Sequence, residues 1–382
     1  MTNGVWGKEL QEMKLLRVKA TGFRNCEDDF CIDLIAKAKK TSEDKEYELM
    51  EIDEGLFVYS TMAIIGKNAS GKTSTLELLD WCYDILSKFQ LTDKEVSYTG
   101  ISLEIIFYEA GEIYKYNTRL DDSLVMEDRA TFYNQELKHK KYYKSKVNQI
   151  YEDNWETVEN IGVLPEDLSI VFFVLKNSKI REICYDSFAE REEIYNTAFK
   201  YVKFFKMEDY LLEGIIRIFD SNIDSLRQLD DNHFELIYQG KVMKMADNEL
   251  FLFLSSGTTK GIALYILAIA SMQNGFDLLI DEIEKHFHKT LVENLICLYK
   301  DKKVNKSNAT LIFTTHYCEL LDMFNRSDNI WITHSREKVI IENMYEKYDF
   351  RSELLKSKKF YQNAFGTAVN YEALMDLKRM LI

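Results

Sequence analysis

The feature that most constrains the fold of this chain is an octapeptide with the pattern GxxxxGK[ST]. Its residues are Gly66, Lys67, Asn68, Ala69, Ser70, Gly71, Lys72 and Thr73. A β-rich run at Leu56–Ile65 precedes it, and apolar residues at helical spacing follow over Thr73–Leu86. Glycines let such a loop curve into a nest of backbone N–H groups, which holds phosphate together with the helix N-terminus. The order strand, loop, helix therefore predicts a phosphate-binding loop (P-loop) rather than a glycine-rich turn without function.

The P-loop needs an acidic partner to complete a nucleotide site. We expect Lys72 to reach the β- and γ-phosphates of a nucleoside triphosphate and the Thr73 hydroxyl to bind Mg²⁺. An apolar strand at Leu278–Ile280 ends in Asp281 and Glu282. We expect Asp281 to hold Mg²⁺ through its hydration shell and Glu282 to polarise the attacking water as general base. Without the P-loop, this pair would be equally consistent with a solvated strand end.

Two weaker patterns follow the same logic. A Ser-x-Gly loop, which opens an expected helix at Thr259–Met272, consists of Ser255, Ser256 and Gly257. It offers an anion a hydroxyl, N–H groups and a helix dipole, although a plain helix cap would have the same sequence. An apolar strand at Thr310–Thr314 leads to His316, which could hydrogen-bond the γ-phosphate and the attacking water. A solvent-facing histidine at a strand end is the alternative.

In this order the four segments resemble the ABC ATPase superfamily, with GKNASGKT as Walker A, LSSGT as the signature, LLIDE as Walker B and TTH as the switch. The resemblance implies that the signature of one copy caps the ATP of a second copy. Two ATP molecules with Mg²⁺ would then lie in a head-to-tail homodimer. A higher oligomer is compatible with the same resemblance.

A narrower resemblance covers both ends of the chain. AIIGKNASGKT, LSSGTTKG and DEIEKHFHKTL are similar to ABC-class AAA family ATPases related to the OLD (overcoming lysogenization defect) proteins, as are LLRVKATGFRN and RSELLKSKKFYQNAFGTAVNY. It implies that Arg24 lies near the nucleotide, although an arginine in a surface turn explains the same residue equally well, and that His288 matches a histidine of that group. The chain after His316 is too short for the Toprim nuclease domain of full-length OLD enzymes. Ser256 and Thr258 replace the Gly and Gln usual in transporters.

The remaining pattern predicts an α/β fold with a mainly parallel sheet, an antiparallel β subdomain and a helical insert. We expect residues 1–120 and 251–382 to form two ATPase lobes, with an irregular and helical insert at 121–250. Specific expectations are a hairpin at 101–116, a solvated loop at 37–48, an irregular segment at 120–165, a buried strand at 170–175 and one helical face along 188–229. No transporter-type glutamine loop is identified, and Gln135 and Gln149 are unsupported candidates for it.

Composition limits the partners. The net charge is −14, which argues against a surface that coats nucleic acid non-specifically. A basic cluster at Lys138–Lys146 could bind nucleic acid or an acidic protein, although a solvated hairpin edge is the simpler interpretation. The six cysteines form no CxxC pair, which favours buried free thiols. The N-terminus lacks a signal peptide and no apolar run spans a bilayer, so we expect a cytoplasmic protein without a membrane role.

Many OLD-related ATPases belong to bacterial anti-phage systems, each paired with a separately encoded effector. The resemblance to them therefore implies the leading hypothesis, an ATP hydrolase that dimerises around ATP and regulates a separately encoded nuclease or toxin in anti-phage defence. A DNA-repair or chromosome-type ATPase acting directly on DNA is the first alternative. The nucleotide-binding subunit of a transporter is a weaker one, and a scaffold that binds ATP without turnover is the non-enzymatic one.

Overall fold

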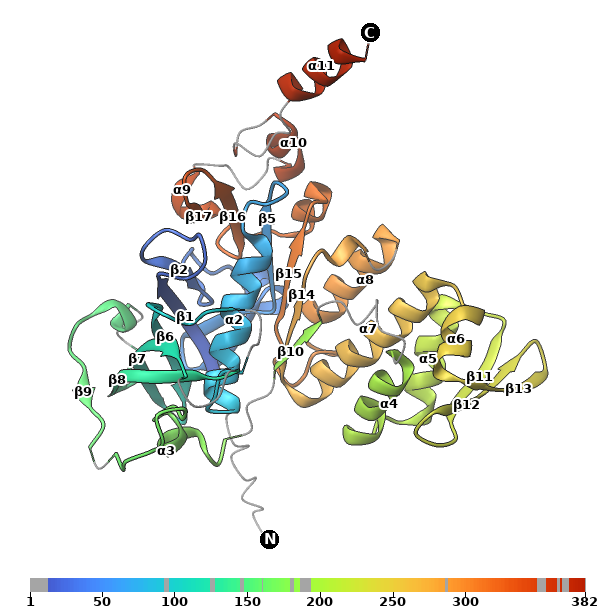
Figure 1. Cartoon of the computed structure of the whole chain (residues 1–382), viewed down its shortest axis with the longest axis horizontal. Helices are drawn as coiled ribbons and strands as arrows, with labels where there is room; N and C mark the ends of the chain where they lie inside the picture. The colour runs from blue at the N-terminus through green and yellow to red at the C-terminus, as the bar shows by residue number, and fades with distance from the viewer. Residues whose placement is uncertain are drawn as a thin grey trace.

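The computed structural model describes residues 13–92, 96–123, 128–144, 148–159, 161–178, 182–185, 194–285, 288–348, 355–362, 365 and 371–381. Two six-stranded sheets dominate it, and α2 (Lys72–Ser87) packs between them, as Figure 1 shows. Helices α7 (Ser256–Asn274) and α8 (Lys289–Lys300) cover the other face of the central sheet.

The central sheet carries the P-loop strand near its middle. Its strands in spatial order are β10 (Glu182–Tyr185), β14 (Asp277–Ile280), β15 (Leu311–Thr315), β5 (Thr61–Gly66), β16 (Ile330–Ser335) and β17 (Val339–Asn343). All neighbours pair in parallel except β16 with β17. Every residue of β5 is buried, because Met62 and Ile64 face α2 while Ala63 and Ile65 face α7 and α8. Burial on both faces is typical of parallel sheets, and the predicted α/β class is confirmed.

The second large sheet is antiparallel and forms the predicted β subdomain. Its strands in spatial order are β2 (Phe30–Asp33), β1 (Lys14–Thr21), β6 (Ser102–Glu109), β7 (Glu112–Asp122), β8 (Ala130–Lys141) and β9 (Glu156–Thr157). The predicted hairpin is β6 and β7. The prediction of an irregular segment at residues 120–165 is wrong over β8, because its polar and aromatic residues form a regular strand of the sheet without an apolar alternation that marks it. The sheet thus continues past residue 120, where the sequence placed the start of an insert.

The predicted helical face at 188–229 is correct only in part, and residues 188–193 lie outside the described residues. Helices α4 (Ile194–Phe204) and α5 (Asp209–Phe219) are present, but Ile223 and Leu226 lie on strand β11 (Ile223–Gln228). A register shift after Ile223 adds one residue to β11, so two residues three apart are both buried. A bulged strand therefore imitates helical spacing here. β11 joins β12 (His233–Tyr238) and β13 (Lys241–Ala246), and α6 (Asp247–Phe253) leads from this sheet to α7.

Two other local predictions are wrong. The segment 170–175 contains the short helix α3 (Phe172–Leu175) instead of a strand. The predicted solvated loop at 37–48 contains helix α1 (Ser42–Tyr47), and two of its acidic residues, Asp44 and Glu48, are buried. Charged composition suggested solvent exposure, but both carboxylates are paired with cations from distant parts of the chain, Asp44 with Arg326 and Glu48 with Lys300.

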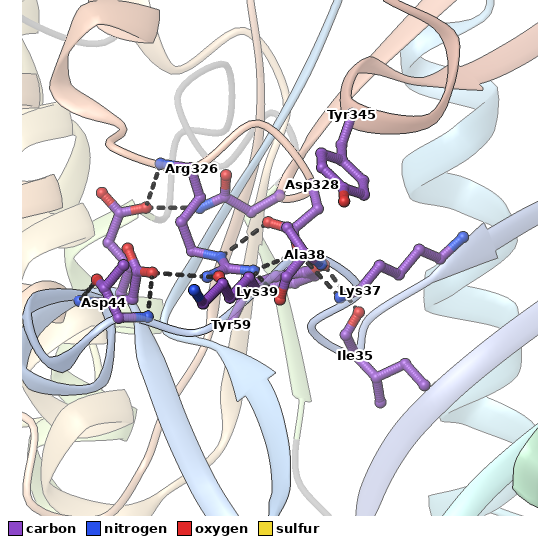
Figure 2. A network of polar contacts seen from close by, with 12 residues as sticks. Ile35, Lys37, Ala38, Lys39, Asp44, Tyr59, Arg326, Asp328 and Tyr345 are labelled. Carbon is purple, nitrogen blue, oxygen red and sulfur yellow. Dashed lines mark hydrogen bonds and ion pairs between the residues drawn. The ribbon is translucent and has the colours of Figure 1, made fainter. Parts of the chain in front are cut away.

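Arg326, the cation that pairs with Asp44, precedes β16. Its guanidinium lies between Asp44 and Asp328, at 2.9 Å from Asp44 Oδ2, and donates to the carbonyl oxygens of Ala38 and Lys39 (Figure 2). Glu48 accepts from the backbone N–H of Arg326 at 3.2 Å. The network thus ties the segment before β3 (Leu49–Asp53) to the loop that leads into β16. β3 in turn forms a two-stranded sheet with β4 (Leu56–Tyr59).

The C-terminal segment follows β17 with α9 (Met344–Lys347), α10 (Lys356–Tyr361) and α11 (Tyr371–Met380). Figure 1 shows α11 projecting away from both sheets. Cys26, Cys31, Cys82, Cys297 and Cys318 are free, as predicted, although Cys31 is only half-buried and Cys297 is exposed. In the part of the chain that the structure describes, no helix is both long and apolar enough to cross a membrane.

Candidate nucleotide-binding site

The P-loop connects β5 to α2 in the expected position. Ala69 (φ 57°) and Gly71 (φ 96°) have left-handed backbone conformations that bend the loop. Lys72 folds back over the loop, so that its Nζ donates to the carbonyl oxygens of Gly66 at 3.2 Å and Lys67 at 2.9 Å. The ammonium group is therefore held at the concave side of the loop, where phosphate oxygens could replace these carbonyl contacts.

Thr333 on β16 is a P-loop contact that the sequence did not reveal. Its hydroxyl lies 2.7 Å from Ser70 Oγ and donates to the carbonyl oxygen of Ile65 at 3.2 Å. A Cβ on Gly66 would lie 2.2 Å from Ser70 Oγ and 2.3 Å from Thr333 Oγ1. Gly66 is thus required by the close approach of β16. No motif marks Thr333, because 260 residues separate it from Thr73 and only the sheet order brings it near.

The acidic strand end meets the start of α2. Thr73 Oγ1 donates to Asp281 Oδ2 at 2.8 Å, and Thr314 Oγ1 donates to the other oxygen of the same carboxylate. The two hydroxyls come from α2 and β15, and the carboxylate follows β14. The order of the sheet brings all three groups together at one edge. Hard oxygen donors of this kind suit Mg²⁺, which binds proteins through one or two carboxylates and takes further ligands from phosphates and water. The predicted pair Thr73 and Asp281 therefore fits the ion.

Glu282 follows Asp281 in a left-handed conformation (φ 45°) that turns the chain sharply. The turn continues as the 3-10 helix η3 (Ile283–Lys285). One Glu282 carboxylate oxygen lies 3.2 Å from His316 Nε2, and Lys285 forms an ion pair with the same carboxylate. The predicted base and the predicted switch histidine are therefore in direct contact. Such a pair can orient a water molecule for in-line attack on a phosphate.

Burial governs the electrostatics of the two basic groups. It lowers the pKa of Lys72 to about 8, although the carboxylates of Asp281 and Glu284 oppose the shift. Burial also lowers the pKa of His316, and the charge of Lys72 acts in the same direction. Both effects favour the neutral imidazole, whose ring can both donate and accept a hydrogen bond.

These groups open onto one cavity of about 800 Å³. Besides Glu282, Lys285 and His316, its lining residues are Asn25, Asn68, Ala69, Ser70, Gly71, Lys72, Thr73, Ser74, Ser335 and Val339. Asn25, Ser335 and Val339 were not predicted. They belong to the turn after β1 and to the β16–β17 hairpin. The Val339 N–H donates to the Asn25 carbonyl oxygen at 2.7 Å, and the Glu27 N–H donates to the Val339 carbonyl oxygen at 2.9 Å. The cavity is large enough for a nucleotide.

Several other predicted residues do not line this cavity. Ser255 caps α7, with its Oγ accepting from the Thr258 N–H at 3.0 Å, and Ser255 and Ser256 are exposed to solvent. Arg24 pairs with Glu77 on α2, and His288 caps α8. Gln135 and Gln149 are hydrogen-bonded within the antiparallel sheet region, to Leu168 and Tyr143 among others. Their assigned roles stay predictions.

The basic cluster is largely engaged inside the chain, and its residues 145 and 146 lie outside the described residues. Lys138 pairs with Glu136, and Lys144 with Glu54. Lys140 is buried, where it donates to Asn154 Oδ1 at 3.0 Å and lies 3.9 Å from the centre of the Trp155 ring. A solvated hairpin edge with internal ion pairs describes this segment better than a free cationic surface.

Fold and site together define a P-loop protein with a mainly parallel α/β sheet. Residues 62–322 match the family "AAA domain, putative AbiEii toxin, Type IV TA system", and the chain belongs to this AAA domain family. No curated protein matches it in sequence.

Two solved structures are similar to the chain at low identity. One is an SmcHead bound to the C-winged helix domain of ScpA, with 12% identity, a TM-score of 0.45, and coverage of 87% of this chain and 98% of that chain. The other is the recombination mediator protein RecF with ATP in the RecFOR pathway, with 12% identity, a TM-score of 0.38, and coverage of 88% and 98%.

Proposed function

We propose that this protein is an ABC-type ATPase that binds ATP with Mg²⁺ and hydrolyses it to ADP and phosphate. The observation that carries the proposal is the convergence of three contacts on one cavity: Lys72 on the P-loop carbonyls, Thr73 on Asp281, and Glu282 on His316. Lys72 would bind the phosphates, and Thr73 with Asp281 would hold Mg²⁺. Glu282 would take a proton from the attacking water while His316 orients it. The metal supplies charge neutralisation on the β- and γ-phosphates.

We further propose that two copies share each ATP. Ser255, Ser256 and Gly257 lie at the N-terminus of α7, where N–H groups and the helix dipole favour an anion. This loop does not line the P-loop cavity of its own chain, and both serines are exposed. A second copy placed head to tail would bring its loop against the γ-phosphate. The P-loop and this loop would then form one composite site.

Replacing Glu282 by Gln tests both proposals. The E282Q variant should bind ATP, turn it over at least 100-fold more slowly than wild type, and accumulate as an ATP-dependent dimer in analytical ultracentrifugation. Lys72→Ala is the matched control, and should lose both ATP binding and the dimer. A wild-type chain without K72A-sensitive turnover would leave only the scaffold hypothesis, and a monomeric ATP-bound E282Q would contradict the shared site.

For the biological role, we propose that the ATP cycle regulates a separately encoded toxin or nuclease in anti-phage defence. Support comes from the OLD-like motifs and from the family description, which names a toxin of a type IV toxin–antitoxin system. Cells that carry this chain with its neighbouring genes should form fewer phage plaques, and the K72A variant should restore the plaque number. Equal plaque numbers with wild type and K72A would contradict a defence role. DNA-stimulated, salt-sensitive ATPase activity of the purified chain would instead favour the DNA-acting alternative.

A further inference from the structure

A second glutamate of the acidic turn also contacts the switch histidine. Glu284 Oε1 accepts a hydrogen bond from the backbone N–H of His316 at 2.5 Å. Glu282 contacts the ring of the same histidine, at Nε2. His316 is therefore held from two sides, with its imidazole against one carboxylate and its backbone against another.

The fold gives Glu284 little freedom to be elsewhere. Ile283 is completely buried in the core under α7 and α8, and the N–H of Lys285 donates to the Glu282 carbonyl oxygen at 2.8 Å. The N–H of Glu282 donates to Thr314 Oγ1 at 2.7 Å, which ties the turn to β15. The anchored turn places the Glu284 side chain beside the residue that follows β15, where His316 begins the next loop.

The other carboxylate oxygen of Glu284 carries a desolvation cost that no hydrogen bond in the described part of the chain offsets. Oε2 is enclosed and has no hydrogen-bond partner among the described residues. A buried, unsatisfied carboxylate oxygen requires an explanation, because its desolvation costs free energy that an apolar side chain would not incur. A function at His316 supplies one, since the same carboxylate satisfies the N–H that would otherwise be left without an acceptor.

We infer that Glu284 is a positioning residue for hydrolysis, which acts by fixing His316 so that its Nε2 meets Glu282 and the attacking water. This inference rests on the proposed ATP hydrolysis and adds to it a residue for which neither the P-loop nor the acidic motif provides a role. Among the described residues, Glu284 makes no hydrogen bond with the P-loop carbonyls or the Thr73–Asp281 pair, although its charge acts on Lys72. Its loss should therefore lower kcat more than ATP affinity, because displacement of a catalytic group by about 1 Å can cost about 100-fold in rate. The effect of the lost charge on Lys72 is common to Glu284→Ala and Glu284→Gln, so their difference reports positioning.

Kinetics of four single variants, His316→Ala among them, and one double variant test the inference. Glu284→Ala should lower kcat by about 10- to 100-fold, with KM for ATP changed less than about threefold. Glu284→Gln keeps an oxygen that can accept the His316 N–H, and should retain kcat within about threefold of wild type. Glu293→Ala is the control, since it removes a partly exposed carboxylate from α8 whose ion pair with Lys289 is weak, and should behave as wild type.

The double variant separates positioning from a general structural effect. If Glu284 acts through His316, adding Glu284→Ala to His316→Ala should lower kcat no further. An equal loss in both backgrounds would overturn the inference, as would wild-type kinetics of Glu284→Ala or an equal loss in Glu284→Gln and Glu284→Ala. A wild-type chain without turnover would overturn the proposed hydrolysis and this inference with it, whereas normal wild-type turnover with an unaffected Glu284→Ala would overturn the inference alone.

Discussion

Single residues shape the P-loop through contacts from outside it. Gly66 has no room for a side chain because Ser70 and Thr333 lie against it, and Lys72 is held by the carbonyl oxygens of Gly66 and Lys67. The loop is thus preorganised by its neighbours. Preorganised donors lower the reorganisation that phosphate binding requires.

Gly66→Ala should therefore displace the loop from β16. The added Cβ would lie 2.7 Å from the backbone oxygen of Thr333, which cannot move without shifting the strand. We expect the Kd for ATP, measured by isothermal titration calorimetry, to rise at least about tenfold. The far-UV circular dichroism spectrum should match that of wild type, because the secondary structure is retained. Gly214→Ala is the control, because no atom lies within 4 Å of its Cβ and α5 should tolerate it. Unchanged affinity in Gly66→Ala would show that the loop adapts.

The lowered pKa of Lys72 predicts a pH-dependent affinity. Its ammonium is charged below about pH 8 and loses its proton above that value in the free protein, while bound phosphates favour the charged form. ATP affinity should therefore be constant below pH 8 and weaken by up to about tenfold per pH unit above it. Fluorescence titrations in EDTA between pH 7 and 9.5 would measure this. Lys72→Arg should show no such decline, because arginine stays charged.

At the scale of elements, charged side chains connect segments that are distant in sequence. Arg326 fixes the loop before β16, and β16 presents Thr333 to the P-loop. The network with Asp44 and Asp328 is thus connected to the candidate nucleotide site through β16. Burial of all three charges is tolerable only because each has hydrogen-bond partners.

Arg326→Ala should leave two buried carboxylates without their cation. We expect the free energy of unfolding to fall by about 3–5 kcal/mol, the usual cost of breaking a buried ion pair from one side. Urea denaturation followed by tryptophan fluorescence would measure the change. Arg379→Ala on α11 is the control, because its ion pair with Asp376 is exposed and should contribute below about 1 kcal/mol. A similar small change in both variants would mean that Asp44 and Asp328 are hydrated.

At the scale of the whole molecule, the N-termini of α2 and α7 do not meet at one site. The first residues of α2 line the P-loop cavity, whereas no residue of α7 does. A site completed in trans makes a prediction that no single-copy site shares. Gly257→Glu has room for its Cβ and places a carboxylate where it suits the helix dipole but repels the γ-phosphate.

Mixing two inactive variants tests the shared site. K72A and Gly257→Glu should each hydrolyse ATP poorly, but their heterodimer contains one site with an intact P-loop and an intact Ser255–Gly257 loop. Because one of the two sites of the heterodimer is complete, an equimolar mixture should hydrolyse ATP faster than the mean of the two variants, and would reach about a quarter of wild-type turnover if the copies paired at random. Phosphate release from equimolar mixtures would measure it. Turnover of the mixture no greater than the mean of the two variants would contradict sharing between copies.

Much of the site could be predicted because its parts are contiguous in sequence. The P-loop lies between a strand and a helix, and Asp281 and His316 each follow an apolar strand, so parallel pairing brings them to one sheet edge. The errors occurred where local pattern and tertiary context disagree. The β11 bulge gave Ile223 and Leu226 helical spacing. The charges of Asp44 and Glu48 suggested solvent exposure, because nothing near them in sequence shows that Arg326, 282 residues after Asp44, is the partner of Asp44.

The sequence by itself determined the α/β class and the candidate residues for phosphate and metal binding, because backbone hydrogen bonding and side-chain period act over a few residues. The tertiary structure decided which residues of different elements contact one another. Thr333 contacts Ser70, Glu284 accepts the His316 N–H, and Arg326 pairs with Asp44 of α1. These contacts depend on strand order and register, which juxtapose residues far apart in the chain. No local pattern encodes them, since each is a single common side chain whose effect depends on the one neighbour that the fold provides.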